Sequence, residues 1–252
     1  AYDNNARQEW IVNIHDPKPA AYDLELFMDM AWNINSVSPS TINNHLGNWL
    51  IREFGESAGK KLLPVMQEYY RLCGIRRPEH MGWTQVELDK ATHVRGLSWI
   101  KDTEFSNDFG GEIDRYLEHY AYIKKAVEDI KQDISIEKRD AYFSHVEYQV
   151  CAAADMATKM LEAQRARSYA NGQANATLWS RDSLMTLANA KSIEAYYDIQ
   201  NITSYYNNKM ASGKWKYSMT YMPRDLFVYY PPMLPVLPSD SIAKEALKKS
   251  SV

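Results

Sequence analysis

The chain has 252 residues, and 45% of them are hydrophobic, which is enough for a sizeable buried core. Its 29 Lys and Arg residues are balanced by 32 Asp and Glu residues, and the formal net charge of −3 contains no basic block. This balance argues against a nucleic-acid-binding surface. No apolar run reaches the roughly 18 residues that a membrane-spanning helix needs, so no membrane partner is expected either.

The first predicted element is a short buried strand over 9–14, where Ile11, Val12 and Ile14 form an apolar run. An amphipathic helix is expected directly after it, over about 20–33. A single strand needs hydrogen-bonding neighbours on both sides, and the sequence offers no convincing parallel partner. The pattern therefore predicts the last strand and helix of an α/β domain whose other strands lie upstream, so that the chain is a fragment.

Three polar residues lie at the carboxyl end of the predicted strand or directly after it, namely Asn13, His15 and Asp16. In α/β folds the loop after a strand's carboxyl end faces the active site, so these side chains are predicted to bind substrate. Asn13 and Asp16 would also serve to cap and turn the chain into the next helix. Both interpretations stay open at this point.

The rest of the chain has a helical pattern, with predicted helices at 39–54, 57–73, 113–134, 137–169 and 180–210. Ser38 is expected to cap the first of these helices, with Pro39 at its first helical position. The third has heptad-like apolar spacing that calls for an antiparallel partner helix, carried by Ile113, Tyr116, Tyr120, Ile123, Val127, Ile130 and Ile134. The predicted fold is therefore mainly α, a helical bundle with one β-strand/helix unit at its N-terminal end.

Composition changes again near the C-terminal end, where several prolines exclude a helix. We therefore expect three segments: the strand and helix over 1–33, a helical bundle domain over 34–226, and an extended Pro-rich linker over 227–252. A last short helix is expected inside the linker, capped near Ser239.

Metal and cysteine chemistry are not expected to be central. The six histidines form no Glu-x-x-His or His-x-x-x-His pair, so no metal site and no cofactor are predicted. The two cysteines, Cys73 and Cys151, lie in apolar helical contexts and are interpreted as free buried thiols, with a disulfide between them as the alternative. No catalytic residue is predicted within the chain.

Several segments in order resemble one known family: WIVNIHDPKP, ELFMDMAWN, EYYRLCGIRRPEHMGW, AQRARSYA and ITSYYNNKMASGKWKYSM. Together they are similar to glycoside hydrolase family 115, the xylan α-1,2-glucuronidases. The resemblance implies a large secreted or periplasmic enzyme that removes (4-O-methyl)-glucuronic acid side groups from xylan, so the partner would be glucuronoxylan or its oligosaccharides. It also implies that 1–33 close a catalytic β/α barrel and that a helical domain follows.

The family's catalytic acids belong to earlier barrel strands, so this chain alone is expected to be inactive. The resemblance supports Asn13 as a substrate-side residue, whereas His15 stands where the family is expected to have glycine. Glycoside hydrolysis needs two carboxylates fixed across the scissile bond, and the sequence suggests no scaffold for such a pair in these helices.

Two roles are compatible with these observations. In the first, the chain is the helical, non-catalytic part of a glucuronidase that braces the barrel and contributes a subunit interface, as a homodimer or a monomer. In the second, it is an independent module that holds a glycan or a partner helix through Trp83, Trp99 and neighbouring Tyr residues. A self-sufficient helical enzyme is a third reading, but no nucleophile–base pair supports it.

Overall fold

The computed structural model describes residues 1–14, 16–81, 102–107, 109–172, 178–223 and 227–235. Within these ranges the chain forms helices and no strand, which confirms the prediction of a mainly α fold. None of the described helices is both long enough and apolar enough to cross a bilayer. The α-helices are α1 (Ala21–Trp32), α2 (Ile42–Phe54), α3 (Glu56–Ile75), α4 (Glu112–Ile130), α5 (Arg139–Tyr142), α6 (Tyr148–Ala170) and α7 (Leu178–Asn208).

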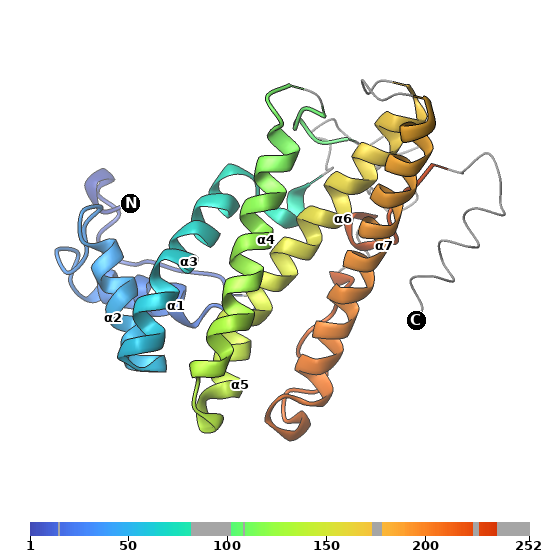
Figure 1. The fold of residues 1–252 in the computed structure, drawn as a ribbon. Coiled ribbons are helices and arrows are strands. Elements are labelled where there is room, and N and C mark those ends of the chain that lie inside the picture. The colour runs from blue at the N-terminus through green and yellow to red at the C-terminus, as the bar shows by residue number, and fades with distance from the viewer. Residues whose placement is uncertain (15, 82–101, 108, 173–177, 224–226, 236–252) are drawn as a thin grey trace.

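The longer helices α3, α4, α6 and α7 stand side by side as a bundle, and α1 and α2 lie on the outer side of α3 (Figure 1). Helix α6 is the central element. Every residue from Lys159 to Gln164 is buried, which covers the full circumference of a helix with 3.6 residues per turn. Helix α6 packs against α4 and α7, so its sequence shows no single apolar stripe.

The heptad pattern correctly identified the buried face of α4. All seven of its apolar positions are buried, and they join one core with residues of α2, α3 and α6. This core also includes Tyr22 of α1 and Val228 of the Pro-rich segment. Those two residues come from the first and third of the expected segments, whose boundaries stay predictions.

The strand predicted over 9–14 is not formed. Its backbone is irregular, Ile11 is 79% exposed and Val12 is 43% exposed, so the prediction of a buried strand is wrong for this structure. The physical reason is the one that makes a single strand unstable: no described segment offers main-chain partners for a sheet. An apolar run by itself does not specify burial.

Two helix boundaries also differ from expectation. Ser38 does not cap a helix, because residues 38–41 form a turn in which the Thr41 amide donates to the Ser38 carbonyl, and α2 begins only at Ile42. The single helix expected over 137–169 is divided into α5, a π-helical turn at Phe143–Glu147, and α6. A π-helical turn adds a residue to the repeat and rotates the following side chains.

Candidate functional site

A pocket of about 830 Å³ lies where the N-terminal segment meets the bundle. Its wall combines elements that are distant in the sequence: residues 12–14 and 16–19, the start of α1, the end of α3 with the turn Pro78–His80, the start of α6, part of α7, residues 219–223, and Tyr229. A concave site built from several elements, with a few polar groups among apolar ones, is the usual form of a small-molecule site.

Two of the three predicted site residues, Asn13 and Asp16, line this pocket. The Asn13 side chain is exposed and makes no hydrogen bond within the described part of the chain. Asp16 is half-buried near Tyr206, where burial of the phenol, and then the Asp16 charge, raise the Tyr206 pKa to about 12. His15, the third predicted residue, lies outside the described residues.

The start of α6 supplies two polar groups that the sequence did not indicate, Tyr148 and Gln149. They follow the π-helical turn directly. The Gln149 side-chain amide donates to the main-chain carbonyls of His145, at 3.0 Å, and of Pro19, so it ties the loop before α1 to α6. The Tyr148 hydroxyl lies 3.2 Å from the Thr203 hydroxyl of α7. These contacts fix one wall of the pocket.

The His145 side chain is half-buried beside this wall and stays uncharged at neutral pH. Burial, and then the positive charge of Lys18, lower its pKa to about 4. A neutral imidazole avoids placing a buried positive charge beneath the pocket. The ring packs against Trp49, with 6.0 Å between ring centroids.

Two further carboxyl groups, Asp23 and Glu79, line the same pocket as Asp16. The Tyr70 hydroxyl donates to the Asp23 carboxylate at 3.3 Å, and burial raises the Asp23 pKa. The sequence suggested no scaffold that would fix a pair of carboxylates of this chain across a sugar bond. The fold does bring three to one pocket, where they are suited to accept hydrogen bonds from sugar hydroxyls.

Among the described residues that line the pocket there is one cation, the guanidinium of Arg77. This side chain is exposed, and it has no ion-pair or hydrogen-bond partner among the described residues. In the sequence, Arg77 belongs to a polar and aromatic connection over 76–83, which is compatible with holding a ligand or with a polar buttress between domains.

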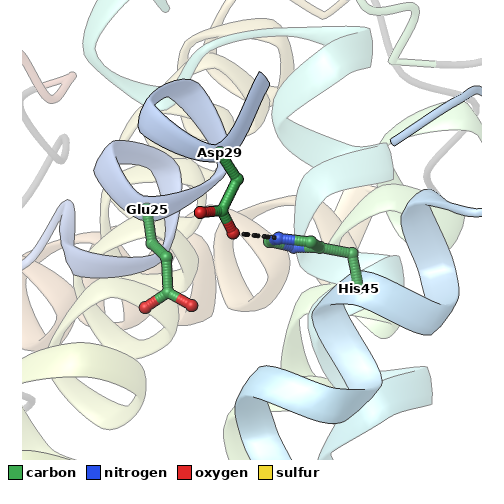
Figure 2. Close-up of side chains that lie close together, drawn as sticks. All are labelled: Glu25, Asp29 and His45. Carbon is green, nitrogen blue, oxygen red and sulfur yellow. Dashed lines mark hydrogen bonds and ion pairs between the residues drawn. The ribbon is translucent and has the colours of Figure 1, made fainter. Parts of the chain in front are cut away.

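A separate cluster of Glu25, Asp29 and His45 has the ligand atoms of a small metal site, all within 4.8 Å of one another. Figure 2 shows Glu25 and Asp29 projecting from α1 toward His45 of α2, with His45 Nε2 3.0 Å from an Asp29 oxygen. The Arg52 guanidinium, however, donates to both Glu25 oxygens, at 2.7 and 2.6 Å. This bidentate pair occupies both carboxylate oxygens of Glu25, so the cluster forms an ion-paired connection between α1 and α2.

Both cysteines are free thiols, as predicted. Cys73 lines the pocket, but burial raises its pKa, which makes it a poor nucleophile at neutral pH. Two other predicted features, the glycan-stacking Trp83 and Trp99 and the terminal helix near Ser239, lie outside the described residues.

Comparison with known proteins identifies similarity both to a family sequence model and to a solved structure. The sequence model of glycosyl hydrolase family 115 matches residues 1–80. A solved structure of a family GH115 4-O-methyl-α-glucuronidase, BtGH115A, with specificity for decorated arabinogalactans, superposes with a TM-score of 0.75 at 37% sequence identity. No curated protein sequence matches the chain.

The extent of the structural match is unequal for the two proteins. It covers 94% of this chain but only 28% of the solved glucuronidase, so the chain spans less than a third of that enzyme's length. The segments on which the sequence resemblance rested extend beyond the part that the family model matches. Because the fold agrees over almost the whole chain at this level of identity, the chain belongs to glycoside hydrolase family 115, as a segment of a longer member.

Proposed function

We propose that the chain is the helical part of an α-glucuronidase that removes (4-O-methyl)-glucuronic acid side groups from a plant polysaccharide. The observation that carries this proposal is the shared pocket: Asn13 and Asp16, expected at the mouth of the barrel, line one cavity with residues of α3 and α6. In this account the bundle forms one wall of the sugar site, while the catalytic acids come from barrel strands outside the chain.

A bracing role is supported by large apolar side chains that stand exposed beside the N-terminal segment. Ile11 is 79% exposed and Trp32 is 93% exposed, and Met28 of α1 is 58% exposed. Exposed groups of this size commonly mark a surface that another domain covers. The upstream barrel is the proposed occupant, and Phe109 and Tyr217, at 85% and 86% exposed, are the proposed candidates for a subunit interface in a homodimer.

The polysaccharide is proposed from two sources. The sequence resemblance implies glucuronoxylan, and the solved relative has specificity for decorated arabinogalactans. We take both polymers to carry glucuronic acid side groups, so glucuronic acid release should be measured with each of them. Secretion or export to the periplasm, where such polymers are met, is part of the same proposal.

An independent glycan-binding module is the second candidate. Its binding site would be the same pocket, which is lined by residues of the N-terminal segment and of the bundle. Such a module would bind oligosaccharides without any hydrolase activity.

One comparison separates the two candidates. Glucuronic acid release from both polymers is measured for this chain and for a longer chain that includes the upstream barrel. Release by the longer chain alone is the expected result. Activity in neither, together with oligosaccharide binding by this chain, would favour the module, and activity in the short chain would contradict an external catalytic pair.

A further inference from the structure

The pocket has an unusual balance of charge. Among its described lining residues, Arg77 is the single cation, and it shares the wall with the carboxyl groups of Asp16, Asp23 and Glu79. A phosphate or another multiply charged anion would be repelled by three carboxylates. A ligand with one carboxylate and several hydroxyl groups fits better, because the hydroxyls donate to the acidic side chains and the carboxylate pairs with the guanidinium.

The main chain beside Arg77 is firmly held. The buried Tyr116 hydroxyl of α4 lies 3.2 Å from the Leu72 carbonyl and 3.1 Å from the Arg76 carbonyl, and it donates to this pair of acceptors. The Arg76 guanidinium donates to the His80 carbonyl at 3.1 Å, which closes the turn from the other side. Pro78 is buried between them.

The Arg77 side chain, unlike the main chain beside it, is not held by any described residue. No described carboxylate pairs with it, although the neighbouring Arg76 pairs with Glu104 at 3.4 Å. A guanidinium on a fixed main chain, exposed in a pocket and without a partner among the described residues, is arranged to receive a planar anion with two parallel hydrogen bonds.

We propose that Arg77 binds the carboxylate of a uronic acid in this pocket and thereby selects acidic over neutral sugars. The inference rests on the proposed function, and it adds the residue of the helical part that recognises the acid group. Asn13 and Asp16 then face the sugar hydroxyls from the opposite segment of the wall.

The test is equilibrium binding of D-glucuronate and of D-glucose, its neutral counterpart, to the full 252-residue chain by calorimetry or NMR titration. Arg77→Gln removes the charge. Arg77→Lys keeps the charge but cannot form the two parallel hydrogen bonds of a guanidinium. Arg115→Gln is the matched control, because Arg115 is also exposed, forms no ion pair with another described residue, and lies on α4 outside the pocket.

We expect the wild-type chain to prefer glucuronate by about tenfold or more, since a charge-assisted pair to an Arg fork is worth that much. The preference should vanish in Arg77→Gln, recover in part in Arg77→Lys, and persist in Arg115→Gln. Equal binding of the two sugars by the wild-type chain, or a preference that survives Arg77→Gln, overturns the carboxylate role while leaving sugar binding intact. Binding of neither sugar also overturns the carboxylate role of Arg77. In that case the proposed function is tested separately, by glucuronic acid release by the longer chain.

Discussion

Lys159 of α6 donates a hydrogen bond to the main-chain carbonyl of Val228, with 2.6 Å between Nζ and the oxygen. The lysine is 1% exposed and has no carboxylate partner within the described residues. Its ammonium group also lies 5.5 Å from the centre of the Tyr196 ring of α7. This contact fastens the Pro-rich segment to the centre of the bundle, and burial lowers the Lys159 pKa to about 7.

The first prediction concerns stability against pH. The folded-state pKa of Lys159 lies below its unfolded value of 10.5, so the unfolded chain binds more protons between about pH 7 and 10.5. Through this group the free energy of unfolding rises with pH in that window, by at most about 1.4 kcal/mol per pH unit. Lys159→Met should remove the rise, as measured by urea unfolding at several pH values. If the free energy of unfolding had the same pH dependence in the wild type and in Lys159→Met, the prediction would be wrong. Lys209→Met, at an exposed lysine, is the control.

A second prediction concerns the contact between α2 and α3. A Cβ on Gly59 would lie 2.6 Å from the Ile51 main-chain nitrogen, so Gly59→Ala must push the helices apart. We expect a loss of about 1–3 kcal/mol in the free energy of unfolding. At Gly74 nothing lies within 4 Å of the added carbon, and Gly74→Ala should stabilise α3 by about 0.5–1 kcal/mol. Similar effects at both positions would contradict the close approach.

Tyr116→Phe tests whether the main chain beside Arg77 is held from α4. Loss of the buried hydroxyl should lower the free energy of unfolding by about 1 kcal/mol, measured by urea unfolding. Glucuronate affinity should fall as well, though by less than in Arg77→Gln, because the guanidinium is kept while its position is less fixed. An affinity equal to that of the wild type would show that this anchor is unnecessary.

A fourth prediction concerns the cluster of Glu25, Asp29 and His45. Because Arg52 holds both Glu25 oxygens, Zn²⁺ should leave the melting temperature of the wild-type chain unchanged. Arg52→Gln frees Glu25 as a ligand, and Zn²⁺ should then raise the melting temperature of that variant. A rise of several degrees in the wild-type chain would instead establish a metal site.

Local patterns in the sequence predicted what depends on local structure. The heptad spacing in α4 identified its buried face, from Ile113 to Ile130, because helical periodicity is visible within a few turns. The strand at 9–14 was mispredicted because burial of an apolar run such as Ile11 and Val12 depends on partners that the described chain does not contain.

The site was predicted only in part for a similar reason. Asn13 and Asp16 follow an apolar run, and their position in a loop pointed to a site. Arg77 and Tyr148 lie more than sixty residues from Asp16 in sequence and reach the pocket only through packing of α3 and α6. The π-helical turn that precedes Tyr148 leaves no simple periodic signal, so the side chains that it positions were missed.

If the N-terminal segment and the bundle form one glucuronate site, as we propose, Asn13 should contribute to catalysis by the longer chain. The measurement is kcat/KM for glucuronic acid release by the longer, barrel-containing chain with Asn13→Ala, against Asn44→Ala as the exposed control on α2 outside the pocket. Loss of one or two hydrogen bonds to the sugar should lower kcat/KM by about tenfold or more in Asn13→Ala, with Asn44→Ala unchanged. Full activity in Asn13→Ala would contradict the account.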